Sequence, residues 1–239
     1  MANFVLVHGA WHGGWCYRDT ARALRAAGHN VFTPTHTGVG ERFHQSSQAV
    51  TLETHIRDVC GLIEAEELER VILCGHSYGG MVITGVADRL RGRISALCYL
   101  DAFLPQAGDS LIGLLHQALP PEVAAQFIGA FRSSADGLMQ ALPAELFGIA
   151  EANRAWVDRR CVVQALATFE MPLLLTHAEP EPDLRRLYIL ADGWDPSPFR
   201  HFAARCETQP DWLVTKMACG HDVMVDMPAE LATELQRLA

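Results

Sequence analysis

A serine with the surroundings of a nucleophile stands in the Gly-His-Ser-Tyr-Gly motif at 75–79. An apolar run, Val71–Cys74, precedes this motif, and an amphipathic stretch follows it, so the motif is predicted to form a sharp strand-to-helix turn. Such a turn exposes the serine hydroxyl at a helix N-terminus, where the helix dipole favours a developing negative charge. We therefore predict that Ser77 is a nucleophile.

A serine nucleophile needs a base, and a histidine late in the chain would supply it. In hydrolases with this kind of turn, the chain order is serine, acid, histidine. His221 lies just after the last predicted strand, in a loop that would return over Ser77, and it is our candidate for the base. His177 and His201 are the other late histidines, and His201 falls inside a predicted helix.

The acid that would orient the histidine has more than one candidate. Asp101 follows the predicted strand Ala96–Leu100, and Asp195 follows the later strand Leu187–Leu190. Asp192 lies in the same later loop as Asp195. We give Asp101 first place and keep Asp195 and then Asp192 as alternatives.

Two backbone N–H groups are needed to stabilise the oxyanion of acyl transfer. One belongs to Tyr78, directly after the nucleophile, and the other is expected from Ala10 in the glycine-rich loop at 8–15. His8 and His12 in that loop have the i, i+4 spacing of metal ligands on a helix, but they lie in a loop and no third ligand accompanies them. We predict no metal site and no cofactor.

The elements around these residues alternate between buried strands and helices. This alternation predicts an α/β fold, a mostly parallel sheet with helices on both faces. The predicted strands are Phe4–Val7, Val31–Phe32, Val71–Cys74, Ala96–Leu100, Leu187–Leu190 and Trp212–Met217. The predicted helices of the sheet region are Tyr17–Ala27, Leu52–Glu67, Met81–Leu90, Pro198–Cys206 and Pro228–Leu238.

From about 105 to 182 the alternation of strands and helices stops, and prolines separate short amphipathic helical pieces around Glu122–Phe131 and Ala152–Ala167. We interpret this stretch as a small, strand-poor helical cap inserted into one domain that spans 1–239. The cap and the loops beside it would line the substrate pocket. Candidate pocket residues are Trp11, Phe103 and Trp156.

Composition narrows the function classes. The chain has 239 residues, 49% of them hydrophobic, which is enough for a large core, and its net charge of −9 argues against nucleic acid or an anionic membrane as partner. Seven scattered cysteines without a Cys-x-x-Cys pair, and the absence of a signal-peptide pattern, favour a cytoplasmic location. A small molecule is the expected partner, and both monomer and homodimer remain open.

The runs 4–15 and 75–88 resemble the plant methylesterase and hydroxynitrile lyase branch of the α/β-hydrolases. The Gly-His-Asp loop at 220–222 extends the likeness over most of the chain, while the cap matches weakly. Within the branch, 1–40 and 50–58 are similar to bacterial carbendazim-hydrolysing esterases, which act on a methyl carbamate. The resemblance implies an α/β-hydrolase fold and hydrolysis of small, largely apolar esters or methyl carbamates.

The lyases of this branch resemble the esterases but carry a Thr after the histidine of the first loop and a Lys after the catalytic histidine. This chain has Gly9 and Asp222 at those places, so it departs from the lyase pattern at both. A serine esterase or carbamate hydrolase is therefore the predicted function. A hydroxynitrile lyase and a catalytically silent protein that binds a small aromatic ligand on the same fold are the alternatives.

Overall fold

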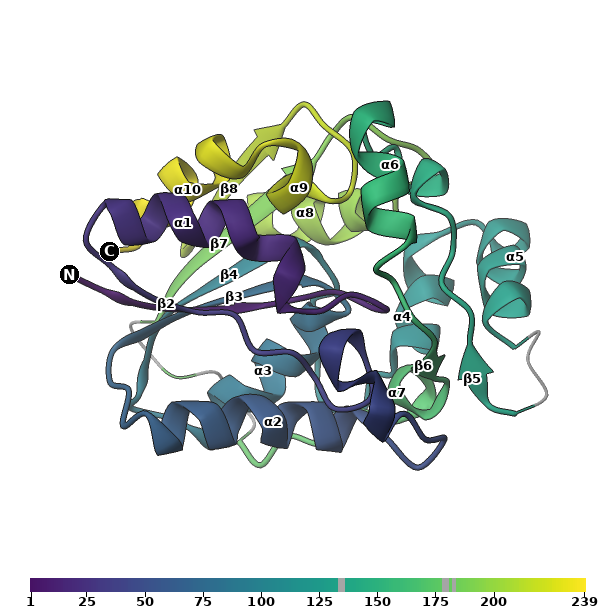
Figure 1. The fold of residues 1–239 in the computed structure, drawn as a ribbon, viewed down its shortest axis with the longest axis horizontal. Helices are drawn as coiled ribbons and strands as arrows, with labels where there is room; N and C mark the ends of the chain where they lie inside the picture. The colour runs from purple at the N-terminus through teal and green to yellow at the C-terminus, as the bar shows by residue number, and fades with distance from the viewer. Residues whose placement is uncertain (133–135, 178–180, 182–183) are drawn as a thin grey trace.

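A parallel β-sheet forms the centre of the computed structural model, which describes residues 1–132, 136–177, 181 and 184–239 (Figure 1). Within these residues the strand order is β2-β1-β3-β4-β7-β8, with every neighbouring pair parallel. The strands are β1 (Asn3–Val7), β2 (Asn30–Phe32), β3 (Val71–Ser77), β4 (Ile94–Ala102), β7 (Arg185–Ala191) and β8 (Trp212–Met217). The predicted α/β class with a parallel sheet is confirmed.

Helices cover both faces of this sheet (Figure 1). Helices α1 and α10 pack together on one face, and α2 and α3 pack together on the other. The helices outside the inserted segment are α1 (Arg18–Ala26), α2 (Leu52–Ala65), α3 (Gly79–Arg89), α8 (Phe199–Glu207), α9 (Val223–Asp226) and α10 (Pro228–Gln236), with short 3-10 turns at η1 (Gly14–Tyr17) and η2 (Gly40–Gln45).

Local sequence explains where several helices begin. The Thr51 side chain accepts a hydrogen bond from the Thr54 backbone N–H, and the Thr54 side chain accepts one from the Thr51 backbone N–H, so a capping box opens α2. The Ser110 side chain accepts a hydrogen bond from the Gly113 backbone N–H and so caps the helix that starts at Leu111, without a reciprocal bond. Pro228 stands in the first turn of α10, where its missing N–H costs no hydrogen bond.

The chain between β4 and β7 is called the inserted segment here. It holds α4 (Leu111–Ala118), α5 (Pro121–Phe131), β5 (Leu138–Met139), η3 (Ala144–Phe147), α6 (Glu151–Asp158), β6 (Gln164–Ala165) and α7 (Ala167–Glu170). Its helices and the β5–β6 pair gather at one end of the sheet (Figure 1). The cap interpretation stays a prediction, and its expected end at Pro182 lies outside the described residues.

One predicted helix in this segment is wrong over half its length. The helix expected over Ala152–Ala167 ends at Asp158, and β6 forms where its last turn was expected. The Asp158 carboxylate accepts a hydrogen bond from the Ala144 backbone, and Val162 donates its N–H to Trp11 in the first loop. These long-range bonds take the chain away from helical geometry, which local amphipathic spacing cannot reveal.

Within the described ranges, we find no helix with the length and apolar character needed to cross a membrane.

Candidate active site

The turn that carries Ser77 has the geometry expected of an exposed nucleophile. Strand β3 ends at Ser77 and α3 begins at Gly79, with Ser77 in the left-handed region at φ 54°. A non-glycine residue there is strained and persists only when its surroundings hold it. A Cβ atom at Gly75 would lie 2.5 Å from the Gly79 carbonyl oxygen, so the close approach of strand and helix requires glycine.

The structure brings His221 together with Asp101, which lies near the end of β4. His221 Nδ1 is 2.6 Å from Asp101 Oδ2, and both side chains are buried. The Trp194 indole N–H donates to the same oxygen at 3.0 Å, and the Ala191 N–H donates to Oδ1 at 3.1 Å. Three donors therefore surround this carboxylate and fix its plane. No pattern in the sequence indicates that Trp194 supports the acid.

The protonation of this pair suits a base at neutral pH. Burial lowers the pKa of His221 to about 4, although the neighbouring Asp222 charge acts to raise it. Burial raises the pKa of Asp101, against the hydrogen bonds from Ala191 and Trp194, which favour the carboxylate. A neutral His221 that donates Nδ1–H to Asp101 keeps a lone pair on Nε2. Such an imidazole can accept the proton of a serine hydroxyl.

The alternative acids and bases lie elsewhere. Asp195 is exposed and pairs with Arg200, Nε to Oδ1 at 3.2 Å, and Asp192 is bound by the same arginine. His177 is exposed, and its Nδ1 donates to the Asp88 carboxylate at 3.0 Å. His201 lies exposed on α8. Within the described part of the chain, none of these four residues forms a hydrogen bond or an ion pair with His221 or Ser77.

An apolar cavity of about 60 Å³ opens beside Ser77 and His221. Its lining also includes Trp11 and Phe103, two of the predicted pocket residues. Trp156, the third, is not part of this lining, because it packs edge-on against Trp15 at 5.0 Å between ring centroids. The remaining lining side chains are mostly aromatic or aliphatic: Leu111, Leu115, Phe127, Phe131, Phe147, Phe169, Trp194, Pro198 and Phe199. A flat apolar molecule suits these walls.

Both predicted oxyanion-hole residues, Ala10 and Tyr78, line this cavity. The peptide before Ala10 is oriented by His8, whose Nδ1 donates to the Gly9 carbonyl at 2.7 Å. His8 Nε2 accepts the His36 backbone N–H at 3.1 Å, which settles the tautomer. Because N–H and C=O of a trans peptide point in opposite directions, the Ala10 N–H is directed away from His8.

A second buried carboxylate, Asp222, joins the closing loop to the first loop. Its Oδ2 lies 2.9 Å from His12 Nε2, and His12 Nδ1 donates to the Ala10 carbonyl at 2.7 Å. Burial opposes both charges, but Cys161 and Asp222 raise the pKa of His12 well above its usual value. The His12 charge in turn holds the pKa of Asp222 well below its usual value. Both shifts indicate an imidazolium–carboxylate pair.

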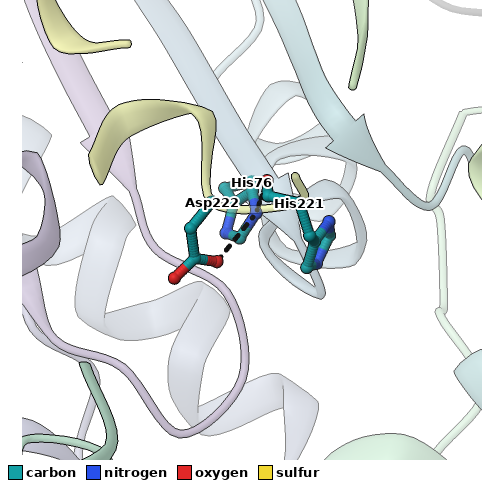
Figure 2. Close-up of side chains that lie close together, drawn as sticks. All are labelled: His76, His221 and Asp222. Carbon is teal, nitrogen blue, oxygen red and sulfur yellow. Dashed lines mark hydrogen bonds and ion pairs between the residues drawn. The ribbon is translucent and has the colours of Figure 1, made fainter. Parts of the chain in front are cut away.

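Asp222 also faces His76, and His221 lies beside them (Figure 2). His76 Nε2 is 3.8 Å from Asp222 Oδ1 and donates to the His221 carbonyl at 3.0 Å. Ligand atoms of these three residues come within 4.8 Å of one another. A metal ion there would compete with the bonds from His221 to Asp101 and from Asp222 to His12. We therefore describe the group as a hydrogen-bonded network, which sequence reasoning missed.

Breaking the His12–Asp222 pair is expected to destabilise the protein strongly. Asp222→Asn leaves the His12 charge buried without a counter-charge, so we expect a loss of roughly 3–5 kcal/mol in the free energy of unfolding. Urea denaturation measures this loss. The double variant His12→Asn/Asp222→Asn should recover part of it, because it removes both charges. Equal losses in the single and double variants would contradict the charged pair.

Buried neutral histidines make the fold sensitive to acid. Burial lowers the pKa of His8 to about 3 and of His55 to about 4, and it lowers the pKa of His36 well below the ordinary 6.5. Below pH 6.5 these histidines bind protons in the unfolded chain but stay neutral in the folded chain. The stability that these three histidines contribute is therefore present above pH 6.5 and is lost as the pH falls toward 4 and below.

His36 offers a clean test of this acid sensitivity. Its ring stacks on His55 with centroids 4.5 Å apart, and neither ring nitrogen has a hydrogen-bond partner among the described residues. We expect His36→Phe to keep the stability seen at neutral pH. It should reduce the dependence of unfolding free energy on pH by up to about 1.4 kcal/mol per unit below pH 6.5. Urea titrations at several pH values test it, and an unchanged slope would refute it.

Comparisons with known proteins agree with this geometry. A model of the alpha/beta hydrolase family matches residues 4–234. The chain is 67% identical over 242 residues to the carbendazim hydrolyzing esterase of Nocardioides sp. (strain SG-4G), with 100% of each chain covered. It is 25% identical over 264 residues to methylesterase 10 of Arabidopsis thaliana, covering 100% of this chain and 92% of the plant protein.

Among solved structures, an extracellular alpha/beta-hydrolase from a Paenibacillus species superposes with a TM-score of 0.84. The sequence identity is 24%, and the match covers 99% of this chain and 98% of that chain, which supports the fold. The predicted resemblance to methylesterases and carbendazim-hydrolysing esterases is confirmed by these relatives. Fold, turn and family model agree: the chain belongs to the alpha/beta hydrolase family.

Proposed function

We propose that this protein is a serine hydrolase that cleaves small, largely apolar carboxylic esters and methyl carbamates. The observation that carries the proposal is the 2.6 Å contact of His221 Nδ1 with Asp101 Oδ2 at the cavity that Ser77 lines. In this proposal Ser77 is the nucleophile, His221 the general base and Asp101 the acid that orients it. The N–H groups of Ala10 and Tyr78 form the oxyanion hole.

The reaction has two halves. Ser77 Oγ attacks the carbonyl carbon while its proton passes to His221 Nε2, and the oxyanion is held by the two backbone N–H groups. The tetrahedral intermediate collapses, and His221 protonates the departing alcohol. Water, activated by His221, then attacks the acyl- or carbamoyl-enzyme and releases the acid. With a methyl carbamate, the leaving group is methanol, and the carbamic acid product loses carbon dioxide to give an amine.

Two observations favour an aromatic methyl carbamate within this substrate class. The cavity walls are dominated by aromatic rings, which suit a flat ring system. A relative that is 67% identical over its full length is named for hydrolysis of carbendazim. No cofactor takes part in this mechanism. The seven free cysteines, all among the described residues, support a cytoplasmic location.

Gly9 and Asp222 separate this function from that of a lyase. Asp222 is held as a carboxylate by His12, and a negative charge next to His221 would repel cyanide. A Cβ atom at position 9 would lie 2.7 Å from His76 Nδ1, so the threonine of the lyase pattern does not fit without a shift of His76. A silent binding protein would have no need of Ser77 beside a neutral, oriented His221.

The test is turnover by the purified protein. We expect methanol release from carbendazim, hydrolysis of aryl esters such as p-nitrophenyl acetate, and no cyanide release from mandelonitrile. Cyanide release would favour the lyase. A protein that leaves both esters and methyl carbamates intact, while an aromatic ligand raises its melting temperature, would be a binding protein, and the proposal would be wrong.

A further inference from the structure

The peptide that joins Ala10 to Trp11 is held at both of its polar edges. Its carbonyl accepts the His12 Nδ1–H at 2.7 Å, and its N–H donates to Gln164 Oε1 at 2.8 Å. His12 is anchored to Asp222, as described above. Gln164 belongs to β6 of the inserted segment, so this end of the first loop is fastened to a different part of the chain.

The Gln164 side chain has only one orientation that satisfies its neighbours. It is 2% exposed, and its Nε2 donates to Thr168 Oγ1 at 2.8 Å. The Thr168 hydroxyl in turn donates to the Ala165 carbonyl at 2.7 Å, so Thr168 Oγ1 is an acceptor toward Gln164. The amide nitrogen must therefore face Thr168, and the amide oxygen must face Trp11.

Trp11 has a backbone conformation that needs such support. Its φ of 63° lies in the left-handed region, where a bulky side chain is strained. The inserted segment binds Trp11 at both backbone groups, because Val162 also donates its N–H to the Trp11 carbonyl at 3.1 Å. Hydrogen bonds from the inserted segment, together with His12, hold the strained residue in place.

We propose that Gln164 is a positioning residue for the oxyanion hole, acting through the Ala10–Trp11 peptide on the Ala10 N–H. The Ala10–Trp11 peptide and the peptide that carries the Ala10 N–H share the Ala10 Cα, and His8 holds the far side of the second peptide at the Gly9 carbonyl. A shift of the Ala10–Trp11 peptide that moves this shared atom therefore also moves the Ala10 N–H. Gln164 thereby connects the inserted segment to transition-state stabilisation. This inference rests on the proposed function, in which the Ala10 N–H binds the oxyanion.

Kinetics of two variants give the first readout. Gln164→Leu removes the acceptor, whereas Gln164→Glu keeps an oxygen at the same reach. We expect Gln164→Leu to lower kcat about 10–100-fold with a nearly unchanged KM, because the lost interaction matters in the transition state. Gln164→Glu should retain most of the rate, because burial favours the protonated carboxyl, in which one oxygen accepts from Trp11 and the O–H donates to Thr168. Asp158→Ala, which loses a hydrogen bond inside the inserted segment, is the control for general loosening.

Binding of a matched pair of inhibitors separates positioning from a structural role. An aryl trifluoromethyl ketone adds to the serine and places an oxyanion in the hole, whereas the corresponding trifluoromethyl carbinol only occupies the pocket. In Gln164→Leu we expect the ketone to bind about 10–100-fold more weakly and the carbinol to bind as in the wild type. Equal weakening of both probes, or of neither, would overturn the inference.

Ligand binding by the wild-type protein separates a failure of the proposed function from a failure of the role of Gln164. If it binds the ketone no more tightly than the carbinol, no serine adduct forms, and the proposed function fails together with this inference. If it binds the ketone tightly and Gln164→Leu does so equally, only the inference fails. If Gln164→Leu does not fold, Thr168→Val is the second variant, because it removes the acceptor that binds the Gln164 Nε2. We expect Thr168→Val to bind the ketone more weakly and the carbinol as the wild type does. Unchanged binding of the ketone in this variant would refute the role of Gln164.

Discussion

Asp101→Asn is expected to lower kcat by about 10⁴-fold while the protein stays folded. The carboxylate accepts N–H bonds from Ala191, Trp194 and His221, and an amide cannot accept all three with the same geometry. An amide NH₂ that faces His221 would demand the wrong tautomer, in which Nε2 carries the proton and cannot act as the base. Kinetics with p-nitrophenyl acetate measure the loss.

The backbone makes asparagine the appropriate substitution. Asp101 has a φ of 42°, in the left-handed region that asparagine tolerates better than most other residues. Asp195→Asn is the matched control, because Asp195 is exposed and contacts Arg200. We expect its rate to stay close to that of the wild type. A large loss in Asp195→Asn with normal activity in Asp101→Asn would exchange the two assignments.

Ser77→Ala is expected to lower kcat about 10⁶-fold, the largest effect that we expect of any substitution in this chain. The hydroxyl is the only group in the proposed mechanism that forms a bond to the substrate. Alanine differs from serine by one oxygen, so the strained turn at φ 54° should be kept. Melting temperature, together with binding of the trifluoromethyl carbinol, checks that the cavity is intact.

The non-additivity of variants sharpens this second prediction. Ser77 and His221 act as one unit, so His221→Ala should cost about as much as Ser77→Ala, and the double variant should be no slower than either. Multiplicative losses would mean that the two residues act in separate steps. Equal rates in the wild type and Ser77→Ala would remove Ser77 from the mechanism.

The sequence predicted the parts of this molecule whose signal is local. The motif at 75–79 follows an apolar strand, and the turn it predicts depends only on neighbouring residues. Strands of a parallel sheet buried on both faces appear as continuous apolar runs, which is why β3 and β4 were predicted within a few residues. The strand Trp212–Met217 was predicted with its observed bounds.

Contacts between distant segments could not be predicted in this way. Asp101 lies near the end of β4 and Asp195 follows β7, and the structure distinguishes them because His221 contacts Asp101 whereas Asp195 pairs with Arg200. His12 and Asp222 are separated by 210 positions, and Trp11 and Gln164 by 153. One residue in the sequence hints at the His12 pair, the aspartate directly after the candidate base, and by itself it indicates only repulsion of cyanide.

The most direct test of the central claim is mass spectrometry of the protein after rapid acid quench of its reaction with carbendazim. We predict a carbamoyl-enzyme whose added mass equals that of the substrate minus methanol, on the peptide that contains Ser77. Ser77→Ala should show no such adduct. An adduct on a residue other than Ser77 would contradict the serine mechanism. Turnover that proceeds without an adduct and is also seen in Ser77→Ala would contradict it as well.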